Sequence, residues 1–231
     1  MLDTETDITN APDNNNVIHG FGRKGQQHDF LEADLASVDR RVTPWVIVAG
    51  HRPWYVTGLG SCGQCRDYFE EILFRYGVDL AIFGHRHHSE RFIPVYRDVA
   101  DSRQMRDPQA PMYITAGGAG NIEGLHRLGT KPPFTAFAYA DDFAYATVHV
   151  QDRNHLQVDF TRSATGELVD SSTLYKSHET AFVQQHSDLN LVGKTVEHKG
   201  KGWAAPLLRP LSHRLVVGAS LLTILVSSVC F

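Results

Sequence analysis

Three histidines follow one apolar segment of the sequence within four positions. His85, His87 and His88 stand in LAIFGHRHHSER, directly after an apolar run and a glycine. A fourth, His51, follows the similar run VIVAG. Neutral imidazole is a good ligand for zinc, iron and other borderline metals, and a glycine beside each ligand permits a tight turn. The pattern predicts a metal site, against the ordinary alternative of solvated loop histidines.

Both histidine segments come at the end of a predicted buried strand. TPWVIVAGH closes its β-branched run at Gly50, and VDLAIFGH gives a second strand over about 78–83. Between them, RDYFEEILFRYG repeats apolar residues on one helical face and ends at Gly77. This order predicts a parallel or mixed sheet, whose ligand site lies beyond the carboxyl ends of the strands. We expect His51 and His85 to share that rim.

The extended segment GHRH decides which side chains can share a site. His85 and His87 are two positions apart, so they point the same way and can serve one ion each or one ion together. His88 points to the other side. We predict that it lies behind the ligands or on the substrate side, and is not a third ligand.

The remaining segments are predicted from turn residues and periodicity. Residues 8–27 are rich in Asn, Gly, Pro and Asp, which predicts an exposed loop, and apolar spacing predicts a helix over about 28–40. Residues 111–124, PMYITAGGAGNIEG, predict a strand and a glycine-rich turn. Alternation over about 136–176 predicts an antiparallel meander of two or three strands. Residues 177–214 lack sustained periodicity and are predicted to be a linker.

Composition excludes one class of partner. The 231 residues fit one large or two ordinary domains, and the net charge of -4 gives no electrostatic footprint for nucleic acid. Thirteen histidines are many for this length.

Cys62 and Cys65 form SCGQC, whose spacing fits a redox dithiol, half of a zinc site or a short local disulfide. No second cysteine pair completes a zinc site, and we identify no βαβ unit leading into the motif. A disulfide on a loop is therefore predicted if the chain enters the secretory pathway, and two ordinary thiols otherwise.

The two ends of the sequence differ. The start, MLDTETDITNAPDNNN, has neither the basic nor the apolar region of a signal peptide. Residues 215–231, LVVGASLLTILVSSVCF, carry no charge and suit the removable tail of a glycosylphosphatidylinositol (GPI) anchor signal. A tail anchor and a buried terminal helix are the alternatives. We expect a secreted or cell-surface, GPI-anchored protein whose N-terminal signal is absent from this chain.

Three segments resemble sequence blocks of the purple acid phosphatase family, especially of its fungal and plant members: VAGHRPWY, GHRHHSER and YITAGGAGNIEG. This family is part of the calcineurin-like metallophosphoesterase superfamily. The similarity runs over about 1–176 and indicates the C-terminal part of the catalytic domain. It implies a partial four-layer α/β fold, a β-sandwich flanked by helices, with antiparallel C-terminal strands. We therefore divide the chain into four parts. Residues 1–110 are the C-terminal portion of the metallophosphoesterase domain, 111–176 the family's C-terminal region, 177–214 the linker and 215–231 the hydrophobic tail.

The same resemblance implies a centre of ferric iron with zinc, manganese or ferrous iron. On this reading His51 and His85 bind the divalent ion and His87 binds the iron. A hydroxide would attack phosphorus while the ions hold the oxygens of an in-line displacement. The expected reaction is hydrolysis of phosphate monoesters at acidic pH, and the quoted blocks assign no general acid.

The family's Asp-x-Gly, Gly-Asp-x-x-Tyr and Gly-Asn-His blocks have no counterpart in this sequence. DTETD at 3–7 lacks the glycine, and Asn121 is followed by isoleucine, so Asn121 is placed with His88 behind the ligands or on the substrate side. Without a bridging carboxylate two adjacent cations would repel, so this chain alone is not expected to hold both ions. Two functions follow: a truncated acid phosphatase, or a silent, membrane-tethered domain that binds a partner on the same scaffold.

Overall fold

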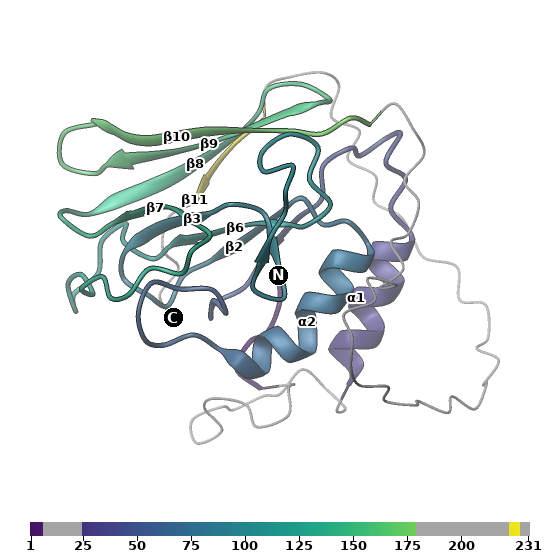
Figure 1. Cartoon of the computed structure of the whole chain (residues 1–231), viewed down its shortest axis with the longest axis horizontal. Coiled ribbons are helices and arrows are strands. Elements are labelled where there is room, and N and C mark those ends of the chain that lie inside the picture. The colour runs from purple at the N-terminus through teal and green to yellow at the C-terminus, as the bar shows by residue number, and fades with distance from the viewer. Residues whose placement is uncertain (7–24, 179–221, 227–231) are drawn as a thin grey trace.

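The computed structural model describes residues 1–6, 25–178 and 222–226 of the chain. Within these residues the chain forms three layers, which Figure 1 shows edge-on. A four-stranded sheet packs on a five-stranded sheet, and two helices cover the other face of the five-stranded sheet. The predicted partial α/β sandwich is thus confirmed.

The five-stranded sheet is mixed, as the strand and helix order predicts. Its strand order is β1-β2-β6-β3-β7, with β1, β2 and β6 parallel and β3 antiparallel to both of its neighbours. At the outer edge of β1, Leu2 forms a parallel bridge with Gly50. The strands are β1 (Ile47–Ala49), β2 (Leu80–Phe83), β3 (Ser89–Phe92), β6 (Met112–Ala116) and β7 (Thr135–Tyr139).

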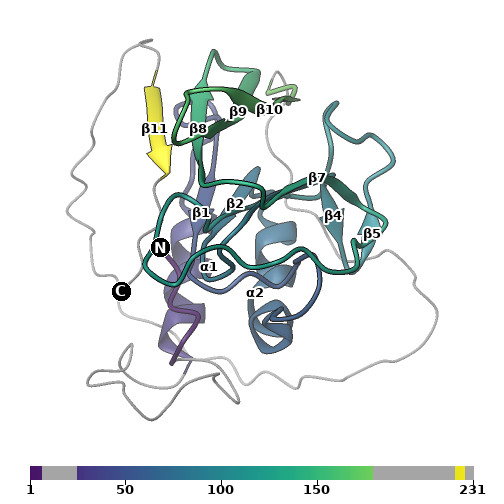
Figure 2. The ribbon, with the colours of Figure 1, turned by 90° about the vertical axis from the view of Figure 1, so that its left-hand side faces the viewer.

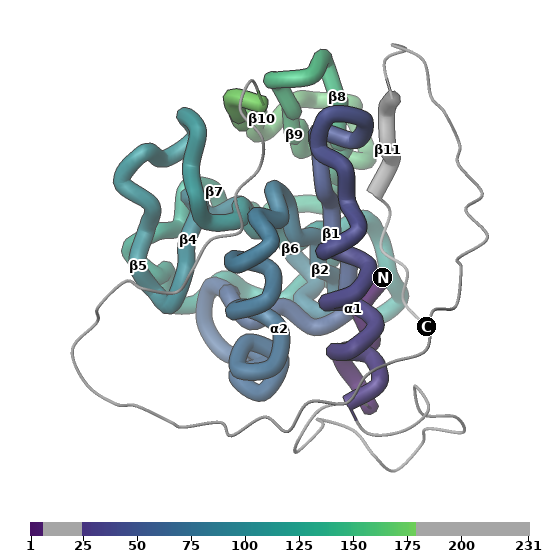
Figure 3. The backbone as a smooth tube through the Cα atoms, turned by 90° about the vertical axis from the view of Figure 1, so that its right-hand side faces the viewer, coloured from purple at the N-terminus to yellow at the C-terminus, as the bar shows by residue number. Residues whose placement is uncertain are grey.

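The helices α1 (Gln26–Ala36) and α2 (Gly63–Arg75) lie side by side on this sheet (Figure 3). Phe69 and Leu73 of α2 are fully buried in the core between helices and sheet. The helix expected over about 28–40 begins two residues earlier and ends at Ala36. The second helix begins at Gly63 because the Cys62 side chain caps it by accepting a hydrogen bond from the Cys65 backbone.

The four-stranded sheet has the order β10-β9-β8-β11 (Figure 2). Alternate residues of β8 and β9 face the five-stranded sheet, so that Val148 and Val158 pack in one core with Ile114. The expected meander is corrected at its start, because β7 pairs with β3 and belongs to the other sheet. The strands are β8 (Ala144–Val150), β9 (His155–Arg162), β10 (Leu168–Tyr175) and β11 (Leu222–Val226), and a separate hairpin joins β4 (Val95–Tyr96) to β5 (Val99–Ala100).

The hydrophobic C-terminal tail is described only at Leu222–Val226, which forms β11 and pairs antiparallel with β8. Its run Leu-Thr-Ile-Leu-Val suits a strand because β-branched residues favour extended backbone. No helix in the described part of the chain is long and apolar enough to cross a membrane. The rest of the tail, and the predicted linker from 179 onward, lie outside the described residues.

A buried group of charges joins three distant segments. Arg40 Nη1 lies 2.5 Å from Asp79 Oδ2, and Lys176 Nζ lies 3.6 Å from Asp79 Oδ1. The same carboxylate accepts a 2.8 Å hydrogen bond from the Val46 backbone. Asp79 is 2 % exposed, so its charge is balanced by these partners and not by bulk water. The group links the segment after α1, the start of β2 and the end of β10.

Candidate metal centre

His51 and His85 emerge from neighbouring parallel strands. Gly50 N donates to Ile82 O over 2.9 Å, and Gly84 N donates to His51 O over 3.0 Å, so strand pairing continues up to both histidines. His85 then adopts a left-handed backbone with φ of 58°, an unusual conformation for a residue with a side chain. Its Nδ1 lies 3.2 Å from His51 Nε2.

This nitrogen pair suits a shared metal ion. Two nitrogen ligands of a tetrahedral zinc ion, each about 2.0–2.1 Å from the metal, are roughly 3.3 Å apart. The observed 3.2 Å between His85 Nδ1 and His51 Nε2 agrees with that separation. Because a guanidinium only donates, the 3.0 Å contact of Arg52 Nη1 with His85 Nε2 places the His85 proton on Nδ1, which donates to His51 Nε2. The two imidazoles can form one edge of a coordination shell without a change in backbone once Nδ1 loses that proton to Nε2 and Arg52 no longer donates there.

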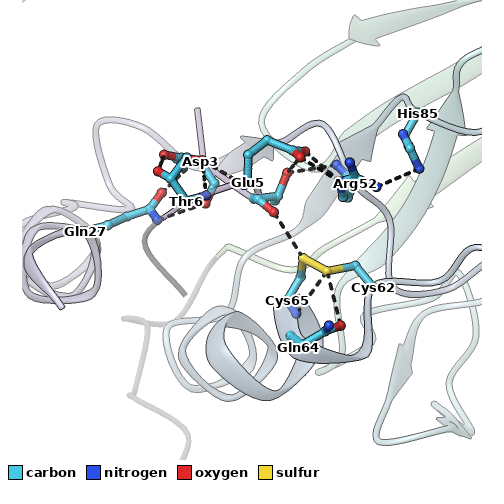
Figure 4. Close-up of a disulfide and its surroundings, with 10 residues drawn as sticks. Asp3, Glu5, Thr6, Gln27, Arg52, Cys62, Gln64, Cys65 and His85 are labelled. Carbon is cyan, nitrogen blue, oxygen red and sulfur yellow. Dashed lines mark hydrogen bonds and ion pairs between the residues drawn. A yellow bond between two sulfur atoms is a disulfide. The ribbon is translucent and has the colours of Figure 1, made fainter. Parts of the chain in front are cut away.

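Burial disfavours the protonated form of both imidazoles, which cannot bind a metal. It lowers the pKa of His85 to about 4, and the positive charge of Arg52 adds to the effect. It also lowers the pKa of His51, against an opposing contribution from Glu5. Arg52 Nη1 lies 3.0 Å from His85 Nε2, and Arg52 Nε donates to both carboxylate oxygens of Glu5 (Figure 4). The N-terminal segment thus orients the outer nitrogen of His85.

His87 is fixed by a second histidine that the sequence analysis missed. The rings of His87 and His126 stack with centroids 4.4 Å apart. His87 N donates to His126 Nδ1, and His126 N donates to His87 O, each over 2.9 Å. Glu123 approaches His87 Nδ1 at 3.6 Å, too far for a hydrogen bond. The high histidine content was the one sequence signal for His126.

His88 lies in the interior of the protein. It is fully buried, and its Nε2 donates to the carboxylate of Glu90. The other Glu90 oxygen accepts from the backbone and hydroxyl of Thr57. The pair therefore ties the ligand segment to the loop after β1. Asn121 lies in a local turn, where its Oδ1 accepts from Glu123 N over 2.8 Å.

The structure joins Cys62 and Cys65 by a disulfide at the start of α2. Cys65 Sγ also contacts the carbonyl oxygen of Thr4, in the segment that holds Glu5 (Figure 4). The motif follows β1 at the N-terminus of α2, and β1 pairs parallel with β2, so the expectation that no βαβ unit leads into the motif is wrong. Both cysteines are buried, at 4 % and 0 % exposure, which keeps them from macromolecular thiols.

The described residues alone do not complete a two-ion centre. Among them, no three His, Cys, Asp or Glu side chains form a group that could hold a metal ion. The carboxylate of Glu5 is bound to Arg52, and no acidic side chain of the described residues joins the histidines in such a group. The histidines therefore fit part of such a centre, which needs additional oxygen ligands.

Comparison with known proteins agrees with this geometry. Residues 6–89 match the calcineurin-like phosphoesterase family, and residues 110–171 match the family described as iron/zinc purple acid phosphatase-like protein C. Acid phosphatase A of Cryphonectria parasitica is 56% identical over 192 residues, and purple acid phosphatase 22 of Arabidopsis thaliana is 39% identical over 136. These matches cover 80% and 57% of this chain, but 38% and 30% of the relatives.

A solved structure supports the same assignment. The purple acid phosphatase PPD1 from yellow lupin superposes with a TM-score of 0.62 at 27% identity, covering 68% of this chain and 29% of the lupin chain. The sandwich and its histidine-bearing rim therefore define a metallophosphoesterase fold. Within that class, the chain belongs to the purple acid phosphatase family and corresponds to the C-terminal part of its catalytic domain. It spans less than two fifths of the length of these relatives.

Proposed function

We propose that this chain contributes part of the metal centre of an acid phosphatase that hydrolyses phosphate monoesters. The observation that carries the proposal is the pair of imidazole nitrogens, His51 Nε2 and His85 Nδ1, 3.2 Å apart at the rim of the sheet. The cofactor would be ferric iron with zinc, manganese or ferrous iron. When bound, these ions supply Lewis-acid activation of the ester and of water.

The chain's own residues would hold and orient the reacting groups. His51 and His85 would bind the divalent ion, and His87 would bind the iron. Arg52 contacts the outer nitrogen of His85, and His126 stacks on His87, so both rings are fixed before any ion binds. Rigid ligands favour a defined ion position, which in-line displacement at phosphorus requires.

The carboxylates that the centre needs would come from sequence present in the longer relatives. We propose that the active enzyme carries this chain as its C-terminal part and that the 231-residue chain alone is a truncated, inactive form. The relatives' greater length supports this proposal, because this chain covers only 38% of acid phosphatase A.

The test is to express two forms, the 231-residue chain and the chain extended with the genomic coding sequence upstream of Met1. We expect the extended form to hydrolyse 4-nitrophenyl phosphate at acidic pH, to lose this activity to a chelator and to regain it with iron and zinc. The short form is expected to be inactive. Hydrolysis by the short form would contradict the truncation, and an inert extended form would contradict the phosphatase.

The second candidate is a catalytically silent, membrane-tethered domain that binds a partner through the same scaffold. It is favoured by the lack of a three-ligand group in the part of the chain that the structure describes. An extended form that folds and binds no metal would favour this candidate over the enzyme.

We also propose that the protein acts outside the cell, at the cell surface through a GPI anchor. Support comes from the disulfide, which persists in oxidising compartments, and from the uncharged segment 215–231. Phosphatidylinositol-specific phospholipase C is expected to release the protein from intact cells. Retention after this treatment, with release only by detergent, would favour a tail anchor instead.

A further inference from the structure

Arg86 is a cation at the candidate metal centre for which the described part of the chain supplies no carboxylate partner. It stands between His85 and His87, and no salt bridge joins it to an acid among the residues that the structure describes. Other arginines near the sheet differ, since Arg52 pairs with Glu5 and Arg91 with Asp170. A guanidinium beside the candidate metal ligands that pairs with no acid among the described residues points to an anion that these residues do not supply.

The position of Arg86 is set by close backbone contacts and not by an opposite charge. Its side chain lies on Gly60, where an added Cβ would be 2.9 Å from Nη1 and 3.1 Å from Cδ. Gly60 has φ of +95°, a conformation that favours glycine, so the loop after β1 leaves room for the guanidinium. On the other side, a Cβ at Gly117 would lie 2.0 Å from the Arg86 carbonyl oxygen.

The guanidinium is partly removed from water without full hydrogen bonding. Its Nε is enclosed and has no hydrogen-bond partner among the described residues. The positive charge of Arg86 is near enough to contribute to the lowered pKa of His126, after the larger effect of burial. An enclosed donor left unpaired costs free energy that a bound anion would offset.

We propose that Arg86 binds the phosphate oxygens of the substrate and positions it at the metal centre. This inference rests on the proposed function and names one residue of its substrate site. The planar guanidinium can donate two parallel hydrogen bonds to a phosphate, and the point charge on the flexible side chain of a lysine matches this geometry less well. The phosphate is either the group being transferred or a second phosphate on the leaving group.

The test compares Arg86→Gln and Arg86→Lys with the unaltered extended enzyme, using 4-nitrophenyl phosphate, inorganic pyrophosphate and binding of inorganic phosphate by calorimetry. We expect Arg86→Gln to raise KM and the phosphate Kd by about 10- to 100-fold, with a smaller change in kcat and full metal content. Arg86→Lys should lie between. Arg103→Gln is the control, because Arg103 bonds to the Asp107 carbonyl in an exposed turn.

Comparison of the two substrates shows which phosphate group Arg86 contacts. A rise in KM for both substrates places Arg86 on the transferred group, whereas a rise for pyrophosphate alone places it on the leaving group. Unchanged KM and phosphate Kd in Arg86→Gln, or loss of metal from both variants, would overturn the inference. Phosphate binding that depends on Arg86 in an enzyme without turnover would refute the phosphatase proposal and leave this inference standing.

Discussion

His87→Ala in the extended enzyme is expected to lower kcat/KM by at least about 1,000-fold, because it removes a ligand from a centre that contributes several kcal/mol to transition-state stabilisation. The fold should survive the change. The backbone N and O of His87 make its two hydrogen bonds to His126, and alanine retains both. Its Nδ1 has no hydrogen-bond partner among the described residues, so truncation leaves few new unsatisfied groups.

The measurement pairs steady-state hydrolysis of 4-nitrophenyl phosphate with metal analysis of the purified variant. His155→Ala is a matched control, since His155 is partly exposed and bonded to Asp152 in the turn before β9. We expect the control to retain its activity and metal content. Wild-type turnover in His87→Ala would remove His87 from the site.

Asp79→Asn is expected to lower the free energy of unfolding by about 3–5 kcal/mol, because it leaves two buried cations without their counter-ion. Arg40 and Lys176 both contact the Asp79 carboxylate, and both are 8 % exposed. The amide can still accept the hydrogen bond from Val46, so the loss is chiefly one of charge. Urea unfolding followed by circular dichroism measures it.

Asp98→Asn makes the same chemical change at an exposed ion pair. Asp98 lies 2.9 Å from Arg66, and its side chain is 60 % exposed. We expect a loss below about 1 kcal/mol, because solvent screens such pairs. Asparagine also tolerates the left-handed backbone at this position, where φ is 62°. Equal losses in the two variants would show that burial of the Asp79 group does not control its contribution.

The elements that hold the site could be predicted because local patterns determine them. The apolar runs before Gly50 and Gly84 form the parallel strands β1 and β2, and the helical spacing between them forms α2. Pairing is less local, since alternation fixes the faces of a strand but not its neighbour. Residues Thr135–Tyr139 therefore form a strand, as expected, but this strand belongs to the five-stranded sheet and not to the predicted meander.

The CGQC motif shows why a helix start is hard to read. Serine and glycine around Cys62 and Cys65 suggest a loop, yet the Cys62 side chain caps the helix and brings the motif into it. A loop assignment separates the motif from the βαβ unit that β1, α2 and β2 form. Packing buries both cysteines, and this burial favours a structural disulfide.

Residues that fix the ligands were missed because their contacts join distant positions. His126 is 39 positions from His87, and Glu5 is 47 positions from Arg52. Nothing in the local sequence of either residue indicates its partner. Such contacts depend on how loops from different strands meet above the sheet, which a single sequence does not specify.

The continuation of strand pairing up to His51 and His85 has a consequence for how an ion would bind. Backbone hydrogen bonds from Gly50 and Gly84 hold the two histidine segments in register. The conformational entropy of bringing the two imidazoles together is therefore lost when the sheet forms and not when a ligand arrives. A preorganised pair therefore spends little of its interaction energy on ordering when an ion and the remaining ligands come together.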